Sequence, residues 1–163
     1  MINISDLGEL TVEYKYKSSF ENRPQITNNN EAFNVIKQVI DIKRIGLQEQ
    51  FIVIYLNASN KVIGTMNQFS GTQTCTVVDF RIIVGAAIQL MASGIIIAHN
   101  HPSSSTFPSV PDIKLTVQLK KALELMGICL IDHIIISPEG DDYTSLTNEG
   151  IINSELTSST EAH

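Results

Sequence analysis

The chain contains segments whose apolar residues recur at every second position and others where they recur at every third or fourth. Residues 9–17 alternate apolar and polar side chains, which predicts a strand. Residues 31–40 carry an apolar stripe with helical spacing, and the asparagines before them can cap a helix. The stripe consists of Phe33, Val35, Ile36, Val39 and Ile40. A strand, a loop and a helix are therefore expected in the first quarter of the chain.

The middle of the chain carries two strand patterns, a helix pattern and a third strand. Residues 50–57 and 61–70 are rich in β-branched side chains and are joined by NASN, which predicts an antiparallel hairpin. Asp79 can cap a helix over residues 80–92. The short apolar run at 93–98 predicts a strand that is buried on both faces.

The last third of the chain continues the alternation of helix and strand. Residues 111–127 predict a helix that ends at its terminal glycine, and residues 128–136 predict another buried strand. Residues 141–150 are typical of a turn followed by a short edge strand. Residues 151–163 are polar and lack periodicity, which predicts a flexible tail.

Strands that alternate with helices, interrupted by one hairpin, indicate a single α/β domain over residues 1–150 with a mixed β-sheet flanked by helices. The chain is long enough to bury one ordinary core. No apolar run is long enough to cross a bilayer and no secretory signal is recognisable, so a cytoplasmic protein is expected. Cys75 and Cys129 lie in apolar surroundings without a C-x-x-C pair, so buried free thiols are expected.

The net charge of −6 argues against a broad electrostatic grip on DNA or RNA. Non-specific affinity for nucleic acids comes mostly from clustered lysine and arginine side chains. Lys114, Lys120 and Lys121 form a modest basic cluster, which is interpreted as a solvated helix face. Strong binding to nucleic acids is therefore not expected.

The segment AHNHPSSSTFPSVPD, residues 98–112, supports two interpretations. In the structural one, Ser109 caps the following helix and Asp112 completes a variant capping box. In the other, the segment is a metal site. His99 and His101 alternate along an extended chain, so their side chains point to the same side while Asn100 points away. Asp112, at the start of the next helix, can then return an oxygen ligand to the same place.

Two imidazole nitrogens and one carboxylate oxygen make three protein ligands. A tetrahedral zinc site with three protein ligands keeps its fourth position for water, which is the pattern of catalytic sites. Zinc also lowers the pKa of such a water towards about 7. The two interpretations are compatible, because Ser109 can cap the helix and still aim its hydroxyl at a substrate oxyanion.

The spacing H-x-H-x7-S-x2-D in this segment resembles the JAMM (JAB1/MPN/Mov34) metalloenzyme motif. Four stretches look more specifically like the JAB domain of the RadC family: VVDFR, AAIQLMASGIIIAHNHPSS, PSVPDIKLT and LIDHIII. The resemblance covers residues 48–150 in unbroken order. It implies a JAB/MPN architecture, similar to the cytidine-deaminase-like arrangement, and one Zn²⁺ ion per chain.

The resemblance also implies a role for each matching residue. His99, His101 and Asp112 would bind zinc, and Ser109 would stabilise the substrate oxygen. The remaining part of the JAMM site is a glutamate from an earlier strand, which acts as general base towards the activated water. Glu49, at the head of the first hairpin strand, is the best match for this glutamate.

Three other residues are given no part in the chemistry of the site. Asp79 is the rival for the general base, but capping of the helix that begins at Phe80 explains it better. His133 lies in an apolar strand and is interpreted as a hydrogen-bonded structural histidine, with a contact to a zinc ligand as the alternative. His163 ends the polar tail and is assigned no function.

The sequence therefore predicts a zinc metallohydrolase that cleaves a peptide or isopeptide-like amide bond. The substrate is left open between a peptide, a protein and a small amide, and a homodimer through the hairpin edge is left open as well. The alternative is a non-catalytic accessory module of DNA metabolism, because the RadC family is linked with DNA repair. Residues 1–47 do not resemble the helix-hairpin-helix segment of full-length relatives, which disfavours this alternative. A nucleobase deaminase is disfavoured because the H-x-E and P-C-x-x-C signature is absent.

Overall fold

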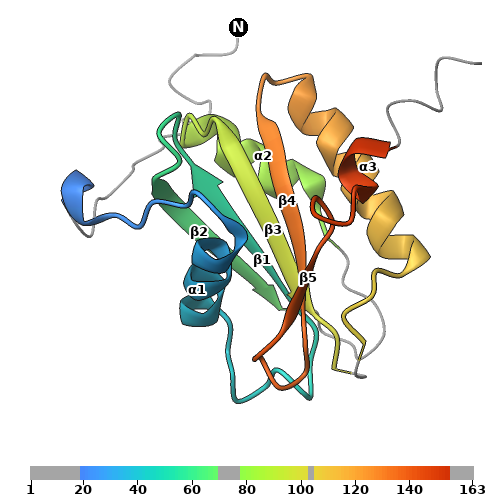
Figure 1. The fold of residues 1–163 in the computed structure, drawn as a ribbon. Helices are drawn as coiled ribbons and strands as arrows, with labels where there is room; N and C mark the ends of the chain where they lie inside the picture. Colours follow the sequence, from blue (N-terminus) through green and yellow to red (C-terminus); the bar gives the residue numbers. More distant parts are fainter. Residues whose placement is uncertain (1–18, 70–77, 103–104, 155–163) are drawn as a thin grey trace, which may run out of the picture.

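A five-stranded sheet with the strand order β2-β1-β3-β4-β5 organises the chain (Figure 1). The computed structural model describes residues 19–69, 78–102 and 105–154. The strands are β1 (Gln50–Leu56), β2 (Val62–Phe69), β3 (Gly94–Asn100), β4 (Cys129–Ile136) and β5 (Tyr143–Ser145). The helices are α1 (Asn29–Val39), α2 (Phe80–Gln89), α3 (Val110–Glu124) and α4 (Ile151–Ser154), with a 3-10 turn η2 (Phe20–Asn22) before them. The strand predicted at residues 9–17 lies outside the described residues.

The sheet is mixed, as predicted. β1 pairs antiparallel with both β2 and β3, β3 and β4 are parallel, and β5 pairs antiparallel with β4 at the edge of the sheet. The parallel pair requires a crossover connection, and α3 supplies it. β1 and β3 are buried along their whole length, because helices cover both faces of the sheet. The carboxyl ends of the parallel strands β3 and β4 therefore lie side by side.

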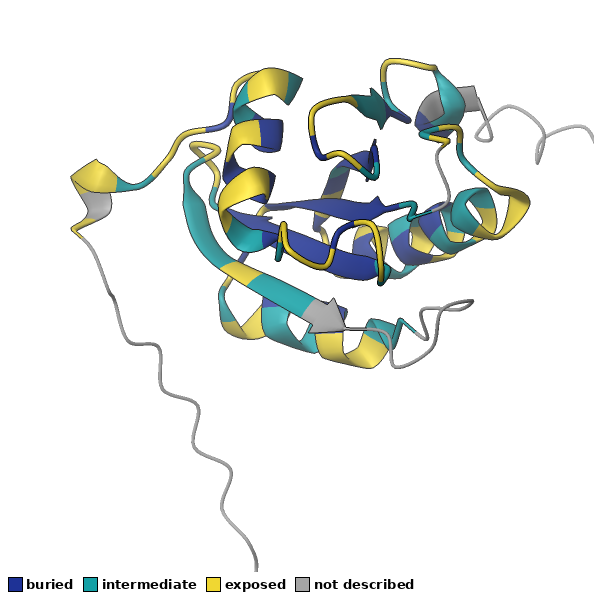
Figure 2. Cartoon of the chain, turned by 90° about the horizontal axis from the view of Figure 1, so that it is seen from below, coloured by how far each residue is buried: buried dark blue, intermediate teal, exposed yellow. Residues whose placement is uncertain are grey.

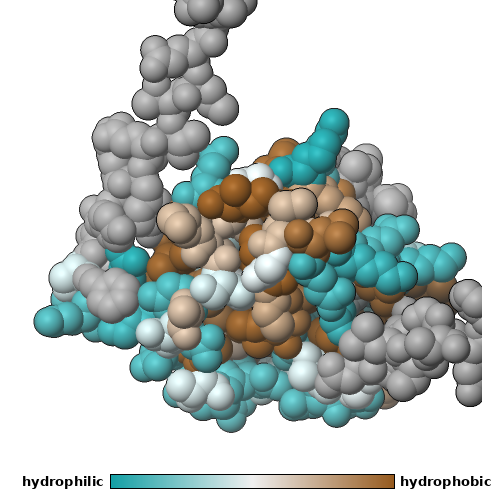
Figure 3. Space-filling model, turned by 90° about the horizontal axis from the view of Figure 1, so that it is seen from above, coloured by the Kyte–Doolittle hydropathy of each residue, from teal (hydrophilic) through white to brown (hydrophobic). Residues whose placement is uncertain are grey.

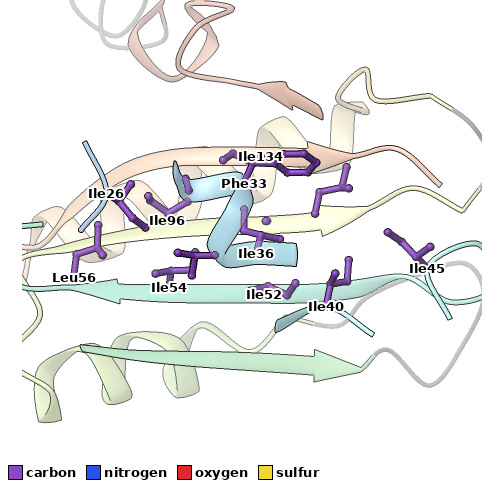
Figure 4. Packing of buried hydrophobic residues seen from close by; sticks show 14 residues of the cluster. Ile26, Phe33, Ile36, Ile40, Ile45, Ile52, Ile54, Leu56, Ile96 and Ile134 are labelled. Carbon is purple, nitrogen blue, oxygen red and sulfur yellow. The ribbon is translucent and has the colours of Figure 1, made fainter. Parts of the chain in front are cut away.

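The two faces of the sheet bury separate apolar clusters. On one face, α1 packs its buried side chains over β1, β3 and β4, and Phe33 of α1 lies beside Ile134 of β4 (Figure 4). The same cluster includes Ile36 of α1 and Ile52, Ile54 and Ile96 of the sheet. On the other face, α2 and α3 cover the sheet through a second cluster. At about 25 cal/mol per Å² of apolar surface, burial of this kind supplies most of the free energy that holds helix to sheet. The predicted α/β fold with flanking helices is confirmed.

Several local signals act as the sequence predicts. Asn28 is the N-cap of α1, and its side chain accepts a hydrogen bond from the main-chain N–H of Glu31 at 3.0 Å. Asp79 caps α2 in the same way, accepting from the main-chain N–H of Arg81 at 2.9 Å. Gly127 follows α3 with a φ of +69°, a left-handed conformation that ends the helix without a Cβ clash.

Two predictions differ from the structure. Cys129 is a free thiol, as expected, but it is exposed rather than buried. It is the first residue of β4, and burial begins with Leu130, which faces the cluster under α3. Cys75 lies outside the described residues. The tail predicted from residue 151 onwards begins with α4, whose Ile152 is buried against Ile135 and Leu146.

The two ends of the sheet differ in character. The carboxyl ends of β3 and β4 lie at the lower end in Figure 1, and Figure 2 looks onto this end. Figure 3 looks onto the opposite end, where apolar side chains gather among polar ones. The turns that precede β3 and β4 contribute the exposed Met91, Leu125 and Met126. The polar segment singled out in the sequence thus follows β3 at the lower end.

Candidate metal centre

His99 and His101 meet at the carboxyl end of β3. His99 is part of the strand and is buried, whereas His101 follows the strand and is partly exposed. Their Nε2 atoms lie 2.9 Å apart, so both rings face the same point, as the alternation along an extended chain predicts. The Nδ1 atom of His101 lies 2.6 Å from the main-chain carbonyl oxygen of Ser105, which can only accept a hydrogen bond. This contact places the proton of a neutral His101 on Nδ1 and leaves the Nε2 lone pair facing His99.

The N-terminal turn of α3 brings Asp112 to the same point. Ser109 is the N-cap of α3, and its main-chain N–H and hydroxyl donate to Asp112 Oδ2 at 2.7 and 2.6 Å. The main-chain N–H of Asp112 donates back to Ser109 Oγ at 3.3 Å, which completes the predicted capping box. Asp112 Oδ1 lies 3.3 Å from His99 Nε2, and Oδ2 lies 3.4 Å from His101 Nε2. The cap therefore fixes the carboxylate beside both imidazoles.

Asn100 points to the opposite side of β3, as predicted, and is fully buried. Its side-chain amide donates to the main-chain carbonyl oxygens of Ile45 and Gln48 at 2.5 and 3.0 Å. Its side-chain oxygen accepts from the main-chain N–H of Gln50 at 2.8 Å. These bonds hold the segment on both sides of Glu49, which is partly buried and immediately precedes β1.

All five residues singled out in the sequence line one cavity of about 190 Å³. These are Glu49, His99, His101, Ser109 and Asp112. The remaining walls are mostly apolar and are formed by Phe51, Val78, Pro111 and Leu115, together with His133. A small cavity with converging polar groups and apolar walls is the usual form of a binding or active site.

The electrostatics of this cavity favour a positive charge between the three ligand candidates. Burial raises the pKa of Asp112, but hydrogen bonds from His101, His99 and Ser109 outweigh it, so the pKa lies well below its ordinary range. The hydrogen bond to Asp112 raises the pKa of His101, although burial opposes it. The Asp112 carboxylate is therefore ionised, and its negative charge favours a protonated histidine or a metal cation beside it.

His133 lies directly behind His99. Its Nε2 atom is 2.8 Å from His99 Nδ1, and its Nδ1 atom is 2.6 Å from the hydroxyl of Thr116 on α3. Burial holds the pKa of His133 well below its ordinary value. The structure therefore favours the alternative interpretation of His133, in which it contacts a ligand candidate. Sequence reasoning missed Thr116, which carries no signal apart from its helical position.

The donor set fits a metal ion. The ligand atoms of His99, His101 and Asp112 all lie within 4.8 Å of one another, so one ion can contact all three. Two imidazole nitrogens and a carboxylate oxygen suit zinc and other borderline transition metals better than calcium or magnesium. The three residues therefore form a group that could hold a metal ion.

Asp79, the rival candidate for the general base, is explained by other contacts. The side chain of Arg81 donates hydrogen bonds to the Asp79 carboxylate at 2.7 to 3.2 Å, and these bonds lower the pKa of Asp79. Together with the α2 cap, these bonds account for Asp79 as a structural residue.

In the basic cluster, Lys120 donates to the main-chain oxygen of Ile152 at 3.0 Å and lies 3.9 Å from Glu124. Lys120 is therefore partly neutralised and tied to α4.

Comparison with known proteins agrees with this architecture. The sequence profile of the RadC-like JAB domain matches residues 26–151. A UPF0758 protein of Staphylococcus haemolyticus is 37% identical over 139 residues, which are 85% of this chain and 58% of that protein. A UPF0758 protein of Porphyromonas gingivalis is 39% identical over 131 residues, 80% of this chain and 56% of the relative. A UPF0758 protein of Aquifex aeolicus is 37% identical over 151 residues, 93% of this chain and 62% of the relative.

The chain belongs to the RadC-like JAB domain family. The matched region begins at residue 26, before the resemblance noted from residue 48 in the sequence, so it includes α1 as well. The chain spans about three-fifths of the length of these curated relatives. None of the described helices combines the length and the apolar character needed to cross a membrane.

Proposed function

We propose that this chain is a zinc-dependent hydrolase that cleaves an amide bond. The observation that carries the proposal is the single cavity that collects Glu49, Ser109 and the His99–His101–Asp112 group. Zinc would be held by His99, His101 and Asp112, and when bound it supplies Lewis acidity towards water and towards a carbonyl oxygen. Membership of the RadC-like JAB domain family supports the same chemistry by analogy.

Glu49 acts as the general acid and base in this proposal. It lines the cavity beside the ligand group, and its charge contributes to the raised pKa of His101. Its carboxylate accepts a proton from the attacking water and returns it to the leaving amine, so that an acid and an amine are the products. The apolar walls formed by Phe51, Val78 and Leu115 limit the access of other water molecules.

Ser109 stabilises the substrate oxygen in this proposal. In the structure its hydroxyl donates to Asp112 Oδ2, so it must exchange this hydrogen bond for one to the substrate. One hydrogen-bond donor to a developing oxyanion contributes on the order of 10² to 10³ in rate. The cavity admits a side chain or a short amide rather than a folded surface, which supports a peptide, a peptide-like tail of a protein or a small amide as the substrate.

The proposal is tested by comparing zinc-loaded wild-type protein with Glu49→Gln on a library of fluorogenic amides and peptides. Glu49→Gln is expected to bind zinc normally and to lose about 10² to 10⁴ in kcat/KM. Glu124→Gln is the matched control, because Glu124 is an exposed glutamate near the end of α3. Hydrolysis that is equal in wild type and Glu49→Gln, or absent from both when zinc is bound, contradicts the proposal.

A further inference from the structure

A continuous chain of hydrogen bonds runs behind the candidate metal centre, from the backbone of α3 to His99. Thr116 Oγ1 lies 2.6 Å from the main-chain oxygen of Asp112 and 2.6 Å from His133 Nδ1. His133 Nε2 lies 2.8 Å from His99 Nδ1. The Thr116, His133 and His99 residues are each no more than 2% exposed, so water does not compete for these contacts.

The direction of each hydrogen bond follows from the first. A carbonyl oxygen only accepts, so the single hydroxyl proton of Thr116 is donated to the main-chain oxygen of Asp112. Thr116 then has only lone pairs left for His133, so His133 Nδ1 carries a proton and donates to it. The donor and acceptor in the contact between Thr116 and His133 are thus set by the main-chain carbonyl group of Asp112.

The ring of His133 is neutral in this arrangement. Its described partners are Thr116, His99 and the ring of Phe51, which meets it edge-on at a centroid distance of 6.4 Å. The carboxylate of neighbouring Asp132 accepts hydrogen bonds from the main-chain N–H of His133 and from the hydroxyl of Ser145, not from the ring. A buried imidazolium without a carboxylate against it is strongly disfavoured. Neutral His133 therefore has a lone pair on Nε2 and accepts a proton from His99 Nδ1.

We propose that Thr116 and His133 are positioning residues that hold the proton of His99 on Nδ1 and so direct its Nε2 lone pair towards His101 and Asp112. The Ser105 carbonyl does the same for His101 from the other side. Both imidazoles then present lone pairs beside the Asp112 carboxylate, which is the arrangement a metal ion requires. This consequence for metal binding rests on the proposed function, whereas the protonation of the His99 ring does not.

The test uses two variants of Thr116 in the full chain. Thr116→Val has nearly the same shape but removes the hydroxyl, and Thr116→Ser restores it. Long-range ¹H–¹⁵N NMR spectra of ¹⁵N-histidine-labelled, metal-free protein at pH 9 show which nitrogen of each ring carries the proton. We expect His99 to be protonated on Nδ1 in wild type and Thr116→Ser. We expect a mixture of the two neutral tautomers of His99 in Thr116→Val, because His133 no longer has a fixed hydrogen-bond acceptor.

Zinc affinity, measured by competition with a chelating dye, is the second readout. Thr116→Val is expected to bind zinc about 10- to 100-fold more weakly, and Thr116→Ser within about threefold of wild type. A His99 ring protonated on Nε2 in wild type overturns the inference whether or not the variants fold. The inference is also overturned if folded Thr116→Val keeps both the His99 tautomer and the zinc affinity of wild type. If His99 is protonated on Nδ1 as expected but zinc does not bind, the ring assignment stands and the proposed function fails.

Discussion

The side-chain oxygen of Asn100 accepts a hydrogen bond from the main-chain N–H of Gln50 at 2.8 Å. Asn100 lies between the two histidines of the candidate metal centre, and Gln50 follows Glu49 directly. The bond therefore connects the end of β3, where two ligand candidates lie, with the segment that carries the proposed general base. Gln50 extends the connection, since its buried side chain bonds to both the main-chain N–H and the carbonyl oxygen of Asp41.

Asn100→Ala is expected to destabilise the protein. It leaves the main-chain carbonyl oxygens of Ile45 and Gln48 and the N–H of Gln50 without their Asn100 partner. Buried groups that lose their hydrogen bonds cost about 1–3 kcal/mol each, so we expect a loss of about 2–4 kcal/mol, with partial relaxation. Urea unfolding measures the loss. The control is Asn34→Ala, at an exposed position of α1, which should change the stability by less than about 0.5 kcal/mol; equal effects of the two substitutions would contradict the role of Asn100.

Ser109→Ala is expected to lower the free energy of unfolding by about 1 kcal/mol, because α3 loses its N-cap. Ser109→Asn should retain most of the stability, since asparagine is a comparably good N-cap. Parallel urea titrations of the two variants measure this difference. A Ser109→Ala protein as stable as wild type would show that the cap contributes little and that Ser109 serves another purpose.

Glu31 makes stability depend on pH at the start of α1. Its carboxylate accepts from the main-chain N–H of Thr27 at 2.6 Å and from the hydroxyl of Thr27 at 2.9 Å. The main-chain hydrogen bond is the largest cause that lowers the pKa of Glu31 below its ordinary value of 4.5. A carboxyl group whose pKa is lower in the folded state stabilises the fold at pH values above its pKa in the unfolded state. This contribution disappears as the pH falls through the pKa of the folded state.

The stability difference between wild type and Glu31→Gln is therefore expected to be largest near neutral pH and to vanish well below pH 4.5. Urea unfolding of both proteins between pH 7 and pH 2 measures it. A difference that stays constant over this range would mean that the Glu31 charge plays no part in the cap.

DNA binding offers a direct test of the alternative function. We expect no binding to a short DNA duplex even at about 50 mM salt, because the net charge is −6 and Lys120 already contacts Ile152 and Glu124. Fluorescence anisotropy with labelled single- and double-stranded DNA measures this. Binding that weakens steeply with salt and is lost on Lys114→Glu with Lys121→Glu would instead favour an accessory role in DNA metabolism.

Local signals in the sequence were sufficient for much of the fold. The caps at Asn28, Asp79 and Ser109 depend on contacts within three residues, so sequence spacing alone predicts them. The same holds for the pairing of His99 with His101, which follows from strand alternation.

The rest depends on the register of strands that are distant in the sequence. β3 and β4 pair with Ile97 opposite His133 and His99 opposite Ile135, which places both histidines on one face of the sheet. No local pattern specifies this register, so the contact between His133 and His99 could only be weighed as an alternative. The hydrogen bonds of Asn100 across 50 and more residues were invisible for the same reason. Cys129 was misjudged because apolar neighbours in sequence do not show where a helix stops covering a strand.

The most direct test of the account is the zinc content per chain after purification without chelators, measured by elemental analysis. Wild type and the matched control His163→Ala, which removes a histidine from the polar tail, are expected to hold close to one zinc per chain. His101→Ala is expected to hold almost none, since it loses one of three protein ligands. If wild type holds no zinc and added zinc does not raise its Tm, the His99–His101–Asp112 group is not a zinc site and the proposed function is contradicted.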